Sequence, residues 1–150
     1  MVRLSISKIS EYDKCSYSFY LTNIKKEQAL IQPEQLKSGI EKHEIFDKSF
    51  DNLPTTANIE QLKQSIISQS NYHKYETDCA NFLQFNKMIY ERGGSLIPAQ
   101  RELKLFDETL NISGIIDRVD MDGDSLLILD YKTGKEHPIE DYYFQLAVYV

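Results

Sequence analysis

The amino-acid sequence predicts an α/β fold, in which helices flank a sheet built around a three-strand meander from about residue 99 to residue 133. Apolar residues recur every three or four positions through much of the first 92 residues, as in amphipathic helices. The period changes to two near Gln100, as in a strand with one polar face. Apolar runs on either side of Asp122-Gly123 then form the strongest hairpin signal in the chain.

Helices are expected in the first two thirds of the chain and again at its end. The predicted segments cover about residues 7–15 with an aromatic continuation to 24, then 34–50, 59–70, 76–92 and 138–150. Ser7 is predicted to cap the first helix, Gly93-Gly94 to stop the fourth, and Pro138 to occupy the first turn of the last. Residues 25–33 are expected to form a connector.

The helix predicted over residues 34–50 carries a histidine on its apolar stripe. Ile40, His43, Phe46 and Phe50 are three or four residues apart, so His43 is expected to face the core. A lone histidine in such a place is usually a hydrogen-bonded core residue. Its neutral imidazole is also a good ligand for a transition metal ion.

The predicted hairpin carries charged residues on one face. A tight turn at Asp122-Gly123 sets Asp117 opposite Ile128, so that Asp117, Asp130 and Lys132 point the same way. The two aspartates are then diagonal neighbours, roughly 7–8 Å apart at the backbone. The continuous apolar run at residues 126–129 predicts a strand that is buried on both faces.

The strand before the hairpin adds a third acidic residue. A tight turn at Glu108-Thr109 sets Glu102 opposite Ile115, on the face that carries Asp117. A single glutamate on a strand is more often solvated.

These charges favour a divalent cation. Two carboxylates repel each other, whereas Mg²⁺ or Mn²⁺ is held by one or two carboxylates together with water and substrate phosphate. Lys132 can orient or help deprotonate an attacking water, or neutralise charge on a phosphate, which suggests metal-assisted hydrolysis of a phosphodiester. The simpler interpretation pairs Asp130 with Lys132 or Arg118, but charges at the end of a buried strand are costly without a ligand. A calcium loop at residues 120–124 is rejected, because it would put Arg118 and Leu129 at ligand positions.

Short motifs follow one another in a recognisable order along almost the whole chain. They are Ser5-Ile-Ser7, Cys15 before the aromatic segment 17–21, Gly39-x-x-x-His43, Glu102, Gly114-x-x-Asp117-x-x-Asp120, Asp130-Tyr-Lys132-Thr-Gly134 and Gln145-x-x-x-Tyr149. In this order, the sequence resembles the RecB-type exonuclease branch of the PD-(D/E)XK nuclease superfamily. That branch includes the nuclease domains of RecBCD and AddAB and the CRISPR-associated RecB-like exonucleases.

The resemblance implies a restriction-endonuclease-like core with a mixed central sheet. It implies a single nuclease domain over residues 1–150 that lacks its C-terminal part. The implied activity is a Mg²⁺- or Mn²⁺-dependent DNA exonuclease of repair, recombination or CRISPR adaptation, often favouring single strands or free ends. A helicase or a CRISPR-associated protein would be a possible partner.

The resemblance also assigns roles to individual residues. The implied metal ligands are His43, Asp117, Asp130 and the backbone carbonyl of Tyr131. Lys132 would be the catalytic lysine, acting with Asp117 and Asp130, and Glu102 an accessory acidic residue. Gln145 and Tyr149 would position the substrate strand or the catalytic residues.

The cysteines bear on a second cofactor. Iron–sulfur members of the branch combine a cysteine at the position of Cys15 with three more beyond the Gln-x-x-x-Tyr motif. The other cysteine here, Cys79, is expected to be a packing thiol on a helix. A four-cysteine cluster therefore cannot be completed within these 150 residues, although a longer chain could anchor one with Cys15.

Composition limits the location and the partners. No apolar stretch reaches the length of a membrane span, no signal-peptide region precedes the first helix, and two isolated cysteines suggest a reducing cytoplasm. The formal net charge is −6, and residues 101–150 hold five basic and eleven acidic side chains. Bound cations would offset part of this excess, and DNA affinity is expected to be weak and sensitive to salt.

Two alternatives remain open at this point. The chain could be a non-catalytic module that binds DNA ends or a partner protein, although every catalytic position is filled. It could also be a nuclease that is active only within a larger helicase or CRISPR assembly.

Overall fold

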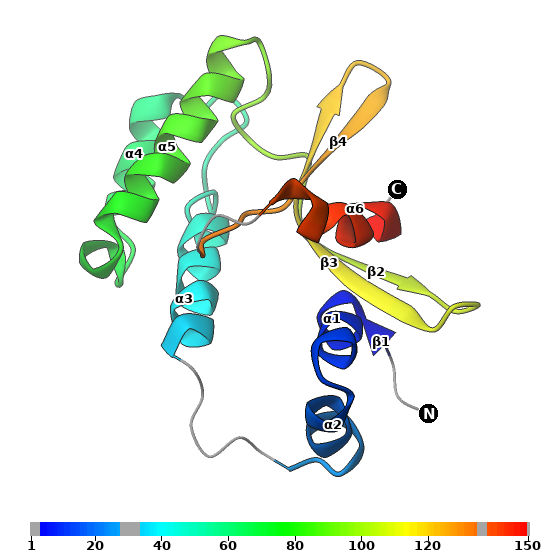
Figure 1. Ribbon diagram of the computed structural model, residues 1–150. Coiled ribbons are helices and arrows are strands. Elements are labelled where there is room, and N and C mark those ends of the chain that lie inside the picture. The colour runs from blue at the N-terminus through cyan, green and yellow to red at the C-terminus, as the bar shows by residue number, and fades with distance from the viewer. Residues whose placement is uncertain (1–3, 28–33, 135–137, 150) are drawn as a thin grey trace. The chain divides into compact units, whose positions relative to one another are not determined.

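The computed structural model describes residues 4–27, 34–134 and 138–149, and confirms a mixed α/β fold with a central mixed sheet flanked by helices (Figure 1). The elements in chain order are β1 (Leu4–Ser5), α1 (Ile6–Lys14), α2 (Ser16–Phe19), the π-helix η1 (Tyr20–Ile24), α3 (Glu34–Lys48), α4 (Ile59–Ile67), the 3₁₀-helix η2 (Tyr72–Lys74), α5 (Glu76–Glu91), β2 (Gln100–Asp107), β3 (Ile112–Asp122), β4 (Ser125–Leu129), the 3₁₀-helix η3 (Ile139–Tyr142) and α6 (Tyr143–Tyr149).

Strand β3 is the centre of the sheet. The strand order is β1-β3-β2, and β4 also pairs with β3. Strand β1 runs parallel to the beginning of β3, and β4 runs antiparallel to its end, which makes the sheet mixed.

The hairpin register differs by two residues from the predicted one. Asp122 pairs with Ser125 and Val119 with Ile128, so the loop consists of Gly123 and Asp124 alone. Gly123 has φ of 60°, a left-handed conformation that glycine adopts without strain and that a two-residue hairpin loop requires. Because side chains alternate with period two, a shift of two residues preserves the predicted face. Continued by one residue, the observed register sets Asp117 directly across from Asp130 rather than diagonally.

The prediction that residues 126–129 are buried on both faces is wrong. Leu126 and Leu127 remain 64 % and 45 % exposed, and only Ile128 and Leu129 are half-buried. In the described part of the chain, β4 pairs with β3 alone. A continuous apolar run indicates burial on both faces only where other layers cover the strand.

The structure divides into two compact units. Unit 1 comprises Met1–Pro33, Lys104–Ile116 and Lys135–Val150, and unit 2 comprises Glu34–Leu103 and Asp117–Gly134. The expectation of a single nuclease domain stays a prediction.

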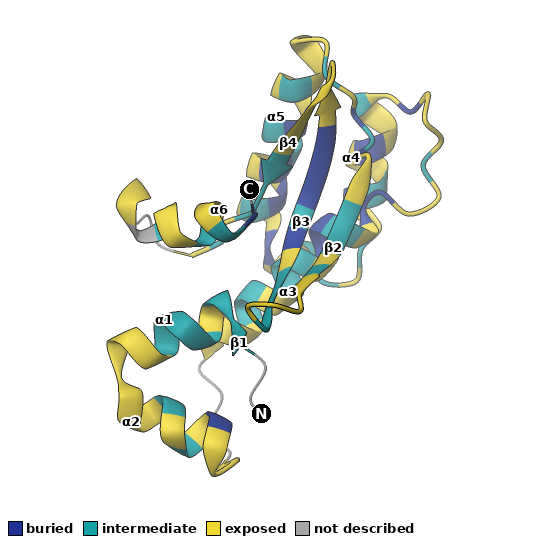
Figure 2. Ribbon diagram, turned by 90° about the vertical axis from the view of Figure 1, so that its right-hand side faces the viewer, coloured by how far each residue is buried: buried dark blue, intermediate teal, exposed yellow. Residues whose placement is uncertain are grey.

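Unit 2 holds the main hydrophobic core, formed by α3, α4, α5, the segments that connect them and the segment between α5 and β2 (Figure 2). Phe46 of α3 stacks on Phe82 of α5 with 4.3 Å between ring centroids. The buried apolar residues of this core are Ile45, Phe46, Phe50, Ala57, Leu62, Ile66, Tyr75, Cys79, Phe82 and Leu96. The helices predicted over 34–50, 59–70 and 76–92 are therefore confirmed, with ends one to three residues shorter.

In unit 1, the first helix differs from the prediction at both ends. Its N-cap is Ser5 rather than Ser7, because the Ser5 side chain accepts a hydrogen bond from the Lys8 amide at 3.3 Å. The expected continuation is interrupted at Cys15, whose backbone is extended. Ser18, Thr22 and Asn23 donate to the Glu11 carboxylate, which ties α2 and η1 back to α1.

The last predicted helix is resolved into η3 and α6, and Pro138 precedes η3. Residues 28–33 of the predicted connector and residue 150 of the predicted last helix lie outside the described residues. No helix in the described ranges is long and apolar enough to cross a membrane.

Candidate metal centre

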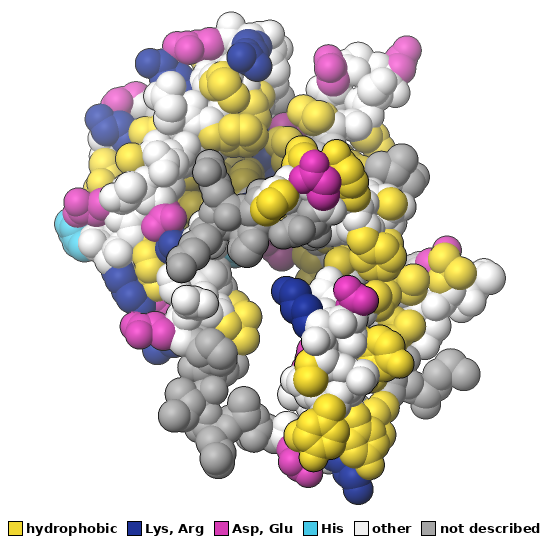
Figure 3. Space-filling model, viewed as in Figure 1, with side chains coloured by type: hydrophobic (Ala, Val, Ile, Leu, Met, Phe, Trp, Pro, Cys, Tyr) yellow, Lys and Arg dark blue, Asp and Glu magenta, His cyan; other side chains and the backbone are white. Residues whose placement is uncertain are grey.

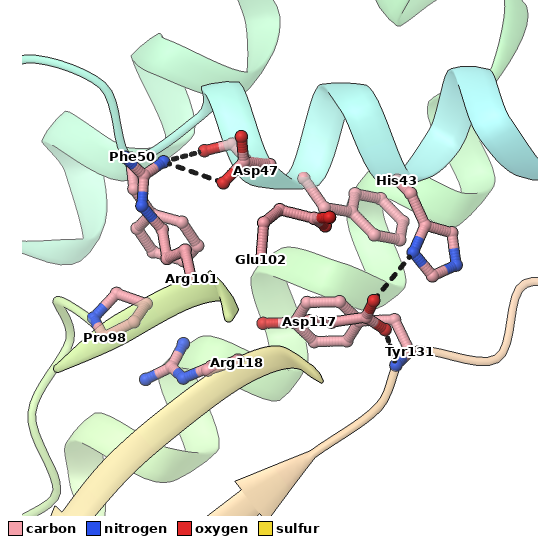
Figure 4. A pocket seen from close by; sticks show the side chains of 10 residues that line it. His43, Asp47, Phe50, Pro98, Arg101, Glu102, Asp117, Arg118 and Tyr131 are labelled. Atoms are coloured by element: carbon pink, nitrogen blue, oxygen red, sulfur yellow. Dashed lines mark hydrogen bonds and ion pairs between the residues drawn. The ribbon is translucent and has the colours of Figure 1, made fainter. Parts of the chain in front are cut away.

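Three side chains of unit 2 converge from three different elements. His43 lies on α3, Glu102 on β2 and Asp117 on β3, and one ligand atom from each lies within 4.8 Å of the other two (Figure 4). One imidazole nitrogen and two carboxylate oxygens are donors of the kind that Mn²⁺ and related divalent ions accept. The residues present therefore fit a divalent cation.

Asp117 is held in place through both of its oxygens. Its Oδ2 accepts a hydrogen bond from the backbone amide of Tyr131 at 2.6 Å, and its Oδ1 lies 3.3 Å from Nδ1 of His43 (Figure 4). The hydrogen bond from the Tyr131 amide connects Asp117 on β3 to the segment after β4, in agreement with the register of the hairpin. The orientation of the carboxylate is thus fixed by the fold.

The carboxylates around His43 raise its pKa. The hydrogen bond to Asp117 raises the pKa of His43 above its ordinary value, and the charges on Asp117, Asp130 and Glu102 add to this effect. Burial acts in the opposite direction but does not outweigh them. The carboxylates therefore favour a positive charge at this place, which a proton or a metal ion can supply.

Asp130 and Lys132 lie beside this cluster, and they form an ion pair. Lys132 Nζ is 2.5 Å from Asp130 Oδ2. Burial raises the pKa of the Asp130 carboxyl, the hydrogen bond from Lys132 lowers it, and the charge on Asp117 raises it again. The pairing of Asp130 with Lys132 is the one that the simpler interpretation of the sequence expected.

Among side-chain ligands, the compact set differs from the predicted set in one member. Glu102, expected as an accessory residue, belongs to it, whereas Asp130 does not. Glu102 has φ of +47°, a left-handed conformation that is uncommon for a residue other than glycine. Such a residue costs about 1–3 kcal/mol and persists where the surrounding structure enforces it. Because the backbone leaves the extended conformation here, simple alternation along β2 could not predict where the Glu102 side chain points.

Tyr131 forms part of the apolar floor of the site. Its ring contacts Phe46, Phe82 and His43, with centroids 5.6, 5.4 and 6.4 Å away. Burial raises the pKa of the Tyr131 hydroxyl to about 12, so the side chain stays neutral. The predicted role of its backbone carbonyl as a metal ligand stays a prediction.

Arg118, considered above as a possible partner of Asp130, is instead a buried residue that pairs with Asp120. It is fully buried, and its guanidinium donates to Asp120 Oδ2 at 2.7 Å, to Asn86 Oδ1 and to the Ser95 carbonyl at 3.0 Å. With His43, Glu102, Asp117 and Tyr131, it lines a cavity of about 10 Å³ in unit 2. The sequence shows Arg118 two residues before Asp120, on the same face of the strand, which could have indicated that the two pair. Strand periodicity does not indicate that an arginine would be buried.

Gln145 and Tyr149 interact with each other and with the beginning of β3 in unit 1. Gln145 Nε2 donates to the Tyr149 hydroxyl at 3.2 Å, and this hydroxyl donates to the Ile115 carbonyl at 2.6 Å. A Cβ atom on Gly114 would lie 2.8 Å from Tyr149 Cε1, so the ring requires glycine there. These contacts link Tyr149 to Gly114 and Ile115 within unit 1. Its expected role toward substrate stays a prediction.

The comparison with protein families agrees with this arrangement. The model of the PD-(D/E)XK nuclease superfamily matches residues 3–150. The chain belongs to the PD-(D/E)XK nuclease superfamily. No match was found among curated proteins or among solved structures.

Membership of the superfamily gives the geometry a chemical meaning. Its members are generally metal-dependent nucleases that use divalent ions, and a nuclease family implies DNA as substrate. The acidic group around His43 is the candidate metal-binding group among the described residues.

Proposed function

We propose that this chain is a divalent-metal-dependent DNA exonuclease of the RecB-type branch, acting at DNA ends in repair, recombination or CRISPR adaptation. The observation that carries the proposal is the convergence of His43, Glu102 and Asp117 in a chain of this superfamily. The order of the motifs supports the RecB-type branch.

The proposed ligands are His43, Asp117 and Glu102, with Asp130 and the carbonyl of Tyr131 completing the set. When bound, Mg²⁺ or Mn²⁺ polarises the phosphate and makes a nucleophile available at neutral pH. Asp117 keeps its orientation through the Tyr131 amide, so this ligand is held in place before the cation binds.

Lys132 is the proposed catalytic lysine. Its ammonium lies against Asp130, at the edge of the cluster, where it can hold a water in line with the scissile phosphate or neutralise charge on the leaving oxygen. The proposed product carries a 5′-phosphate. Gln145 and Tyr149 are proposed to position the substrate strand.

Binding of DNA is proposed to be weak and dependent on salt. Acidic and basic side chains are interspersed on the face shown in Figure 3, and the whole chain carries a formal net charge of −6. Affinity that relies on a few phosphate contacts falls steeply as salt is raised.

End-labelled single-stranded DNA with Mn²⁺ or Mg²⁺ tests the proposal. Wild-type protein should release nucleotides from the ends and leave circular single-stranded DNA intact. Asp130→Ala and Lys132→Ala should both lose this activity, and Asp122→Asn on the hairpin loop is the matched control. Equal activity in wild type and both site variants would contradict the proposal, and cleavage of the circle would replace an exonuclease with an endonuclease.

A further inference from the structure

Lys42, the residue before His43 on α3, is a largely buried lysine with three partners in unit 2. Its side chain is 13 % exposed. Its ammonium donates to the backbone carbonyl of Thr133 at 3.1 Å and lies 2.9 Å from Asp78 Oδ1 on α5. It also lies 5.4 Å from the centroid of the Tyr75 ring.

These contacts are specific to Lys42 among the lysines of α3. Lys37 is 67 % exposed and Lys48 is 52 % exposed, and both pair with a glutamate four residues away on the same helix. Burying an ammonium is costly unless a charge and hydrogen-bond acceptors compensate it. Asp78 supplies the charge, and the Thr133 carbonyl supplies a fixed acceptor.

The contact to Thr133 matters because of what this segment carries. Residues 130–134 form no helix or strand, so the sheet does not fix their backbone. Hydrogen bonds to other parts of unit 2 include two from this segment: the Tyr131 amide donates to Asp117, and the Thr133 carbonyl accepts from Lys42. Lys132 lies between these two points.

Helix α3 also lies close to the same segment at Gly39. A Cβ atom at this position would lie 3.8 Å from Thr133 Oγ1, which is an ordinary contact distance. Helix α3 thus supplies His43 to the cluster and, one residue earlier, an anchor for the segment that carries Lys132.

We propose that Lys42 is a positioning residue, which holds the backbone of residues 131–134 so that Lys132 stays at the edge of the metal centre. The inference rests on the proposed nuclease function. Displacing a catalytic group by about 1 Å can cost roughly 100-fold in rate. Loss of a residue that orients the groups around a metal typically costs 10- to 100-fold.

The test compares Lys42→Met with Lys37→Met on the same helix, using three measurements. Hydrogen exchange of residues 131–134, followed by mass spectrometry without metal, should be at least tenfold faster in Lys42→Met, while exchange in α4 is unchanged. With Mn²⁺, kcat should fall about 10- to 100-fold. The Kd for Mn²⁺ should rise by a clearly smaller factor than kcat falls, because His43, Glu102 and Asp117 lie outside the loosened segment and only the proposed Tyr131 carbonyl ligand lies within it. Lys37→Met should match wild type in all three, and Lys42→Arg should recover part of the lost rate.

Two results would overturn the proposal. One is unchanged exchange in residues 131–134. The other is a loss of Mn²⁺ affinity as large as the loss of kcat, which would mean that Lys42 acts through His43. If Lys42→Met does not fold, Asp78→Asn removes the countercharge and is held to the same expectations. An inactive wild type would refute the proposed function. The exchange measurement needs no catalysis, so it would still decide whether Lys42 anchors the segment.

Discussion

Asp117 and Asp120 lie three residues apart on β3, and their surroundings are opposite in electrostatic character. Asp120 is paired with a fully buried arginine, which in turn reaches Asn86 and the Ser95 carbonyl. Asp117 faces a histidine, with Glu102 within 4.8 Å and the charge of Asp130 close enough to shift the pKa of His43. The fold balances the charge of Asp120 internally, whereas around Asp117 it gathers further negative charge. The first arrangement compensates its own charge, whereas the second favours a positive charge, which a proton or a cation can supply.

The largest expected effect is a loss of catalytic rate when a charged residue beside the Asp117 cluster is replaced. Lys132→Met should lower kcat by at least about 100-fold, the size expected for one group that stabilises charge in the transition state. Its affinity for Mn²⁺ should stay close to that of wild type, because the lysine is not a ligand. Steady-state kinetics and calorimetric titration measure the two quantities, and loss of Mn²⁺ binding in this variant would show that the assigned role is wrong.

The next effect concerns stability. Asp120→Asn leaves the Arg118 guanidinium buried without its countercharge, which should cost about 3–5 kcal/mol of unfolding free energy. Asp117→Asn relieves repulsion among carboxylates and keeps an acceptor for the Tyr131 amide, so its stability should change by about 1 kcal/mol or less. Urea denaturation without metal compares the two variants. Equal destabilisation would remove the distinction drawn between the two aspartates.

The dependence on pH provides a finer test through His43. The raised pKa means that the proton contributes stability to the metal-free protein below the ordinary value of 6.5, and that this contribution is lost as pH rises through the raised pKa. A metal ion needs the neutral imidazole, so the affinity for Mn²⁺ should rise as pH rises through the pKa of His43. Below the pKa of His43, the Kd should rise about tenfold for each unit that pH falls. The His43→Asn variant should lose most of this dependence, and an unchanged pH profile in it would assign the dependence to another group.

The smallest expected effect lies at the far end of the same hairpin. Leu126 is exposed, so Leu126→Ser should change the unfolding free energy by no more than about 0.5 kcal/mol. Val119→Ala, on the buried part of β3, should cost at least about 1 kcal/mol by the same denaturation measurement. A large loss in Leu126→Ser would mean that β4 is covered in solution.

The elements that could be predicted are those set by local periodicity. Alternation with period two predicted that Asp117 and Asp130 lie on one side of the hairpin. The predicted register was wrong by two residues, and a shift of two residues keeps side chains on the same face. Spacing of three and four residues predicted α3, α4 and α5, and it predicted a core-facing His43, whose ring lies beside those of Phe46 and Tyr131. Ile40, on the same predicted stripe, is 57 % exposed instead. These features depend on residues close together in the sequence.

The features that could not be predicted depend on contacts between distant residues or on one unusual backbone angle. The entry of Glu102 into the compact set coincides with a left-handed residue within a strand. The burial of Arg118 depends on Asn86, 32 residues away, and the exposure of Leu126 depends on which elements cover β4. Composition and alternation contain no information about such pairs.

The most direct test of the central claim is calorimetric titration of Mn²⁺ into wild type, Asp117→Asn and the matched surface variant Asp122→Asn. The cluster of His43, Glu102 and Asp117 predicts saturable binding in wild type and in Asp122→Asn, and its loss in Asp117→Asn. Binding of equal strength in all three proteins, or none in wild type, would contradict the assignment of this cluster as a metal centre.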